Sequence, residues 1–265
     1  MFGARLLMED KSCRVYLPGG GQHHAQPNRA SGFCFFNEPA LTVHTMLEYG
    51  ARRVFYLDLD AHHGDGVQDA FAYDDRVFTL SIHEDRRWPM ARDGSSAGNV
   101  LDRAGGKARN IPVPPGFNDT ELDFLTTTVV LPLISDFVPD VIYIQCGADA
   151  LADDPQSKLT VSNLAIWQTV AAVATEVPKL LVAGGGGYNP YAVGRCWSGI
   201  WAIMNGISIP EKLPKEVESC LRAVKWDHRL ARNAPEHWFT TLADPPRNGL
   251  VRKIIKELAE AVLEL

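Results

Sequence analysis

Five short segments of this chain are almost continuously apolar, and they limit its possible folds more than any other feature of the sequence. A strand that is buried on both faces has this composition, whereas a strand with one face in water alternates apolar and polar residues. Helical patterns lie between the segments, and this alternation predicts an α/β fold with one mostly parallel sheet and helices on both of its faces. The strand candidates are 13–19, 53–60, 76–83, 140–147 and 179–185, and the helix candidates are 38–49, 119–136, 162–176 and 190–204.

Length, charge and cysteine content narrow the class of protein. We expect residues 1–265 to form a single domain, with the tail 211–265 packed onto it. A formal charge of −6 without a run of Lys or Arg argues against a nucleic-acid partner. No apolar stretch approaches the roughly 20 residues of a membrane span, so no membrane partner is expected. Five widely spaced cysteines, and an N-terminus unlike a signal peptide, favour a reduced, cytoplasmic location.

The chemically unusual residues stand where the predicted strands end. The stretch GGGQHHA follows 13–19, DLDAHHGDG closes 53–60, GADALADD follows 140–147, and GGGGYNP follows 179–185. In open α/β sheets, ligands bind outside the carboxyl ends of the strands. We therefore predict that these four strand ends meet at one site. The connection 84–108 has no clear periodicity, and a loop of this length is often functional.

A divalent metal ion is the simplest way to accommodate so much charge in one crevice. Residues two apart in an extended strand face the same way, so Asp58, Asp60 and His62 are expected on one side. Carboxylates crowded in a buried place need a positive charge among them. We predict that Asp60, His62 and Asp149 bind the metal, in the open ligand pattern of a catalytic zinc, although Fe²⁺ accepts the same donors. The ordinary alternative is a surface turn with capping aspartates.

Other polar residues at these strand ends could supply acid–base chemistry. Two anionic ligands cancel the formal charge of Zn²⁺ and acidify its water less than three histidines would, so a separate base is useful. His23 and His24 are candidates, and Asp58 and Asp65 could fix their tautomers. Tyr188, after four glycines, could donate a hydrogen bond to a developing oxyanion. The alternatives are solvent exposure for the histidines and plain packing for the tyrosine.

Taken together, GGGQHHAQPNRASGFCFFN, DLDAHHGDGVQDAF, GADALADDP and GGGGYNP resemble the motifs of the zinc-dependent histone deacetylase superfamily, in the same order. The bacterial acetoin-utilization branch looks most similar, and the resemblance covers about residues 13–205. It implies the arginase/deacetylase three-layer α/β fold. It also implies a zinc-dependent amidohydrolase, a deacetylase that converts an N-acetyl amide to amine and acetate. Acetyl-lysine, an acetylpolyamine and related small amides all remain open as substrates.

The resemblance also implies roles for single residues. The implied zinc ligands are Asp60, His62 and Asp149. The implied catalytic residues are His24 as general base and acid with Asp65 as its partner, His23 as an electrostatic residue with Asp58, and Tyr188 as the group that polarises the carbonyl. The implied substrate tunnel contains Phe33, Trp88, Gly32 and Gly186. A structural K⁺ or Na⁺ would be bound by Asp58, Asp60, His62, Ser81 and Ile82, and a second such ion by a site including Phe71 and Val77.

Two rival functions stay open at this stage. A binuclear-metal amidinohydrolase of the same fold would need further carboxylate and histidine ligands, and a non-catalytic remnant would only capture an acyl-lysine or a partner. Members of the superfamily usually carry a further stretch, on the order of a hundred residues, before the paired histidines. We therefore expect an uncovered sheet edge near the N-terminus, which another copy of the chain or a partner could cover.

Overall fold

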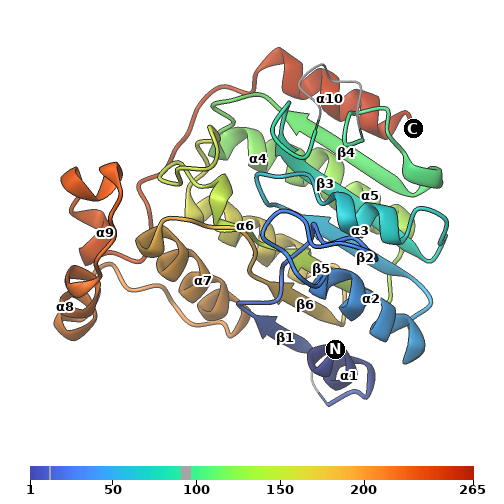
Figure 1. Ribbon diagram of the computed structural model, residues 1–265, viewed down its shortest axis with the longest axis horizontal. Coiled ribbons are helices and arrows are strands. Elements are labelled where there is room, and N and C mark those ends of the chain that lie inside the picture. The colour runs from blue at the N-terminus through green and yellow to red at the C-terminus, as the bar shows by residue number, and fades with distance from the viewer. Residues whose placement is uncertain (12, 91–96) are drawn as a thin grey trace.

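Six parallel strands form one sheet in the computed structural model, which describes residues 1–11, 13–90 and 97–265 (Figure 1). Within these residues the strand order is β1-β6-β5-β2-β3-β4. The strands are β1 (Arg14–Leu17), β2 (Val54–Asp58), β3 (Val77–Glu84), β4 (Ala108–Val113), β5 (Val141–Gln145) and β6 (Leu180–Ala183). This arrangement confirms the predicted α/β fold with a parallel sheet. All strands run the same way, so their carboxyl ends lie along one edge.

Strict alternation along the strands divides the core into two layers. In β2, Phe55 and Leu57 face one cluster of buried residues, whereas Val54 and Tyr56 face the other. Successive side chains of a strand point to opposite faces, so a strand that is apolar at every position packs against helices on both sides. The helices on the Val54 side are α1 (Phe2–Met8), α2 (Glu38–Glu48) and α3 (Asp65–Ala70). On the Phe55 side lie α4 (Asp119–Leu125), α5 (Leu131–Phe137), α6 (Asn163–Ala174), α7 (Pro190–Met204) and α10 (Lys253–Leu263).

Four features differ from the sequence prediction. Strand β4 was not predicted, because its sequence ARNIPV mixes Arg109, Asn110 and Pro112 with apolar residues; Pro is tolerated here because β4 is an edge strand. The short helices α1 and α3 were also missed. The predicted helix 119–136 is α4 and α5 joined by a π-helical segment, Thr126–Val130. Pro132 lacks the N–H that an unbroken α-helix needs, and the Thr128 hydroxyl donates to the carbonyl of Phe124.

The C-terminal tail is only partly packed against the sheet. Helix α10 lies beside β4 and buries Ile255 and Val262 (Figure 1). Helix α9 (His237–Thr240) buries Trp238, whose ring stacks on Tyr191 of α7 at 5.3 Å between centroids. Helix α8 (Lys215–Ala223) contains no buried residue. In the described part of the chain, no helix combines the length and the apolar character needed to cross a membrane.

The contact between α6 and α7 depends on a missing side chain. A Cβ atom at Gly199 would lie 2.0 Å from Cζ2 of Trp167, and the indole is fixed because its Nε1–H donates to the Cys196 carbonyl at 2.8 Å. We predict that Gly199→Ala lowers the free energy of unfolding by about 1–3 kcal/mol through overpacking. Gly194→Ala is the matched control in the same helix. Nothing lies within 4 Å of a Cβ there, so alanine should stabilise by up to about 1 kcal/mol. Equal effects in urea denaturation would contradict this packing.

Candidate functional site

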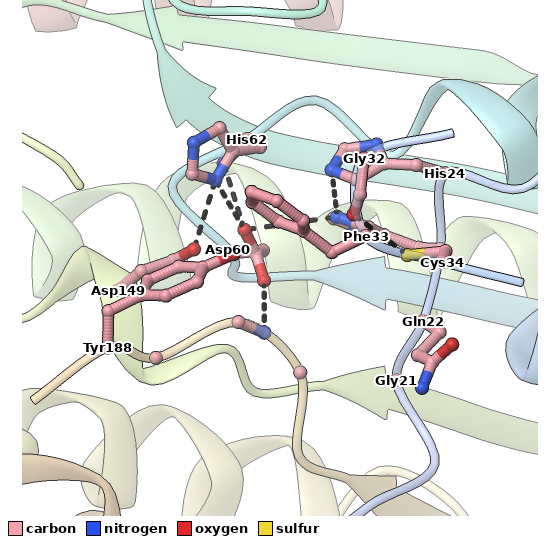
Figure 2. Close-up of a pocket in the computed structure, with 14 residues that line it drawn as sticks. Gly21, Gln22, His24, Gly32, Phe33, Cys34, Asp60, His62, Asp149 and Tyr188 are labelled. Atoms are coloured by element: carbon pink, nitrogen blue, oxygen red, sulfur yellow. Dashed lines mark hydrogen bonds and ion pairs between the residues drawn. The ribbon is translucent and has the colours of Figure 1, made fainter. Parts of the chain in front are cut away.

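A pocket of about 190 Å³ opens at the carboxyl ends of four strands (Figure 2). Its wall combines residues that follow β1, β2, β5 and β6 with the loop that contains Gly32, Phe33 and Cys34. The strand ends β1, β6, β5 and β2 are consecutive neighbours in the sheet, so residues distant in sequence meet here. The structure therefore brings the four motifs to one place.

The pocket floor is a cluster of two carboxylates and one imidazole. Nδ1 of His62 lies 3.1 Å from Oδ1 of Asp60 and 3.0 Å from Oδ2 of Asp149 (Figure 2). Both aspartates are buried, and one ligand atom from each of the three residues lies within 4.8 Å of the others. These are the three residues predicted to bind a divalent metal, and the donor set of one nitrogen and two carboxylate oxygens suits Zn²⁺.

The second oxygen of each carboxylate is held by the protein. Oδ2 of Asp60 accepts hydrogen bonds from the Gln145 side chain at 2.8 Å and from the Gly186 N–H at 2.9 Å. Oδ1 of Asp149 accepts from the Ala61 N–H at 2.9 Å. A Cβ at Gly186 would lie 2.1 Å from Oδ2 of Asp149, so only glycine allows this approach. These donors fix the two carboxylates beside His62, as protein groups around metal sites commonly do.

The cluster is charged in a way that calls for a bound cation. Burial and the neighbouring Asp60 carboxylate raise the pKa of Asp149 to about 7. Burial alone would lower the pKa of His62, but the hydrogen bonds and charges of Asp149 and Asp60 outweigh it and raise this pKa to about 10. Two carboxylates in a low-dielectric site therefore hold a proton on the imidazole, in the place that a divalent ion would take.

The extended geometry expected for 58–62 is wrong. Strand β2 ends at Asp58, so its alternation does not reach Asp60 and His62. Asp58 instead faces His23, with 2.7 Å between its Oδ2 and Nδ1, and also accepts a hydrogen bond from the Tyr56 hydroxyl at 2.6 Å. Its other oxygen accepts from the Asp60 N–H at 3.1 Å. Asp58 thus supports the loop that carries the metal-binding candidates.

The paired histidines form two imidazole–carboxylate dyads. Nδ1 of His24 lies 2.8 Å from Oδ1 of Asp65, and Nδ1 of His23 has the same relation to Asp58. Each Nδ1–H must donate, since a carboxylate only accepts, and this leaves both Nε2 atoms facing each other at 2.9 Å. The loop is held by Asn37, the N-cap residue of α2, whose Nδ2–H donates to the carbonyls of His23 and Ala25.

The two histidines differ in basicity. Burial and the charge of His23 lower the pKa of His24. Burial would also lower the pKa of His23, but Asp58 and Asp60 reverse this and raise it to about 9. Near neutral pH the pair therefore carries one positive charge, which is on His23, while His24 is neutral.

Aromatic side chains line the route into the pocket. Tyr188 lies over the cluster; burial and the Asp149 carboxylate raise its pKa, so the phenol stays protonated. The Phe33 and Tyr188 ring centroids are 6.2 Å apart, and the Trp88 ring lies 4.7 Å from that of His24. Gly32 has φ +53, and a Cβ there would meet the rings of His24 and Trp88 at 2.4 and 2.5 Å. The predicted tunnel residues thus surround one opening, with Gly186 deeper, against the carboxylates.

Two residues at the site escaped the sequence reasoning. Gln145, the last residue of β5, bonds Asp60 as described and also accepts from the Gly147 N–H at 2.7 Å. Asp154 accepts from the backbone N–H of Tyr188 at 2.6 Å and of Asn189 at 3.3 Å. The adjacent acidic residues of GADALADD gave a signal for Asp154, but bonds to backbone groups across the fold could not be read from spacing.

The predicted monovalent-cation residues lie in two places. Asp58 and Ser81 are register partners in β2 and β3, and the Ser81 hydroxyl is 2.8 Å from Nδ1 of His83. Ile82 follows in β3, buried. Phe71 and Val77, of the predicted second site, flank the turn between α3 and β3; both are buried, and the Phe71 carbonyl accepts from the Asp74 N–H at 3.0 Å. Cation binding at either place stays a prediction.

A second cluster of possible ligands exists beside the tail, formed by Asp153, His237 and Asp244. Arginines already neutralise it: Nη1 of Arg195 is 2.6 Å from Oδ1 of Asp244, and Nη2 of Arg247 is 3.6 Å from Oδ1 of Asp153. In the described residues, the Asp60 cluster is thus the one three-ligand group without a guanidinium.

The parallel sheet, with imidazole and carboxylates at its strand ends, defines the arginase/deacetylase fold with a candidate metal site. Residues 1–204 match the histone deacetylase domain. Histone deacetylase 9 of Arabidopsis thaliana is 37% identical over 216 residues, covering 79% of this chain and 48% of that protein. The acetoin utilization protein AcuC of Staphylococcus aureus (strain MRSA252) is 33% identical over 266 residues, covering 97% of this chain and 67% of AcuC.

Solved structures agree with these sequence relatives. The crystal structure of an HDAC homolog from Aquifex aeolicus has a TM-score of 0.85 and 36% identity, and the match covers 93% of this chain and 67% of that chain. A crystal structure of an HDAC homolog complexed with SAHA gives the same values. The chain belongs to the histone deacetylase family, in its bacterial AcuC-like branch. It spans less than half the length of the plant relative.

Metal content gives a direct test of the site. We predict that the protein, loaded with Zn²⁺ and dialysed, retains one ion per chain, and that Asp149→Asn falls well below one because a neutral amide is a poor ligand. Asp153→Asn is the control from the cluster that arginines neutralise, and it should retain one ion. Elemental analysis measures both. Two ions per wild-type chain would support the binuclear rival, and none would contradict the site.

Proposed function

We propose that the chain is a metal-dependent deacetylase that hydrolyses an N-acetyl amide to amine and acetate with one Zn²⁺, or Fe²⁺, in its pocket. One observation carries the proposal: a His24–Asp65 dyad and the Tyr188 phenol line the same pocket as the Asp60–His62–Asp149 cluster. Membership of the histone deacetylase family supports it, as does the SAHA complex of a homolog with the same fold. A cytoplasmic location belongs to the same proposal.

The three ligand candidates fit a single divalent ion. One ligand atom from each residue lies within 4.8 Å of the others, and Oδ2 of Asp60 and Oδ1 of Asp149 are already occupied by protein donors. When bound, the metal would polarise the acetyl carbonyl and acidify a water molecule. Because two ligands are anionic, this acidification is limited and the protein must supply the base.

His24 is the group suited to accept the proton of the attacking water. It is neutral near pH 7, its Nδ1–H is fixed by Asp65, and its unprotonated Nε2, which faces Nε2 of His23, is the atom that can take up a proton. His23 is suited to remain an imidazolium, stabilised by Asp58. The 2.9 Å between the two Nε2 atoms keeps the charge of His23 beside His24, and the leaving amine takes up the proton that His24 received from the water.

Tyr188 serves as the hydrogen-bond donor to the substrate. Because its pKa is raised, its hydroxyl keeps its proton and can donate to the carbonyl oxygen as negative charge develops there. The Asp154 carboxylate fixes the Tyr188 backbone and so positions the phenol. The rings of Phe33 and Trp88 would hold an aliphatic stem and exclude water around the amide.

Acetate release tests the role of Tyr188. With an acetyl-lysine peptide and zinc-loaded protein, Tyr188→Phe should lower kcat by about 10²–10³-fold, the usual effect of losing one oxyanion donor. Tyr73→Phe is the control, since Tyr73 is 97% exposed and outside the pocket. A Tyr188→Phe protein with full activity would remove the phenol from the mechanism.

The general base is tested in the same assay. His24→Gln should lower kcat by about 10²–10⁴-fold, because the water would lose its proton acceptor. Zinc content of the variant serves as the control and should remain at the wild-type level, since His24 is not a predicted ligand. If wild-type protein instead binds acetyl-lysine and releases acetate from no acetylated amine, the non-catalytic rival is correct.

A further inference from the structure

The pocket opens outward into a larger cavity of about 990 Å³. Its inner boundary is shared with the pocket through His24, Phe33 and Tyr188. One side of the outer wall is the segment 84–90, which begins at the last residue of β3. The other side is formed by Lys158, Gln156 and Pro115. Whatever flanks the acetylated nitrogen must lie in this outer cavity, because the acetyl group occupies the small pocket.

Acidic groups of the outer wall are largely neutralised. Glu84 is buried, and both of its carboxylate oxygens accept hydrogen bonds from the Arg87 guanidinium. One of them also accepts from the backbone N–H of Lys158 at 2.8 Å. Glu84 thus serves to tie the two sides of the wall together and presents no free charge. Asp85 remains half-buried, with its Oδ2 3.6 Å from Nε of Arg86.

The exposed charges of the wall are positive. Arg86 is exposed and has a φ of +55, a left-handed backbone conformation uncommon outside glycine, and it makes only a loose ion pair with Asp85. Lys158 is exposed, and the described residues offer its ammonium no carboxylate within ion-pair distance. The described part of the wall carries three cationic and two acidic side chains, although the chain as a whole has a net charge of −6.

We propose that Arg86 and Lys158 select acetylated amines with anionic surroundings, namely an acetyl-lysine flanked by Asp or Glu in a protein or peptide. The inference rests on the proposed deacetylase function and names its substrate class. Cationic groups at the mouth of a cleft attract anions and repel cations over a Debye length, about 10 Å at 0.1 M salt. Acetylpolyamines, whose remaining amines are cationic, are therefore disfavoured.

Three peptides of equal length test this selectivity, each with one acetyl-lysine flanked on both sides by Asp, by Asn or by Lys. We expect kcat/KM to decrease in that order, with about tenfold between the Asp and Lys peptides at low salt. The difference should shrink severalfold near 1 M salt, where the Debye length is about 3 Å. The kcat/KM for N-acetylspermidine should be about as low as that for the Lys peptide. A Lys peptide turned over as well as the Asp peptide would overturn the proposal.

Variants of the wall assign the effect to named residues. Lys158→Gln brings the described wall to zero net charge and should lower the Asp-over-Lys preference toward one. The double variant Arg86→Gln/Lys158→Gln and the single variant Lys158→Glu both make the wall negative and should reverse the preference. Arg86→Lys/Lys158→Arg keeps both charges and should keep the preference. Lys256→Gln, on the exposed side of α10, is the control and should leave it unchanged. A preference that survives in the double variant would contradict the assignment.

Binding separates this proposal from the proposed function. Fluorescence anisotropy with the three labelled peptides reports the same order of affinity without turnover. Absence of acetate release from every peptide, with the binding order intact, would contradict the deacetylase function alone. Acetate release from all three at equal rates and equal affinities would contradict the selectivity alone.

Discussion

Two buried carboxylates that face a single imidazole are the constraint on which this structure depends. In a low-dielectric site, Asp60 and Asp149 can both remain ionised only with a cation between them. Protonated His62 supplies one positive charge against their two negative charges. The sheet delivers the three residues from two neighbouring strands, and the glycine at 186 lets the backbone after β6 donate to Asp60. The excess negative charge of the floor is thus the reason to expect a cation there, and the close approach of the backbone explains the glycine at 186.

The protein around this floor is arranged in successive supports. Asp58 and Asp65 hydrogen-bond the two histidines, and Asn37 holds the loop that carries them. Gln145 donates to Asp60, and Asp154 accepts from the backbone of Tyr188. Most of these are buried polar groups that are hydrogen-bonded to other polar groups. Leaving such a group without its partner costs free energy. The arrangement therefore fixes the candidate catalytic side chains without a bound substrate, and such preorganisation is one way in which a rigid site can lower a reaction barrier.

Much of this could be predicted from the sequence, for physical reasons that differ between elements. Continuous apolar strands predicted the sheet, and motifs at strand ends predicted which residues meet. Strand β4 could not be predicted because Arg109, Asn110 and Pro112 obscure its pattern; its place in the sheet comes from pairing with β3. The expected alternation through Asp60 and His62 was wrong because β2 ends at Asp58, whereas the predicted pairing of Asp58 with His23 is present. Local patterns report burial and period, whereas side chains that bond distant backbone groups leave no such trace.

Hydrogen bonds connect the C-terminal tail to the segment that contains Tyr188. Trp238 of α9 donates its Nε1–H to Asp153 at 2.7 Å, and the next residue, Asp154, holds the backbone of Tyr188. Because Asp153 and Asp154 are adjacent in the chain, one short segment connects α9 to the backbone of Tyr188. Under the proposed function, local opening of the tail is expected to disturb the position of Tyr188 more than that of Asp60 and His62.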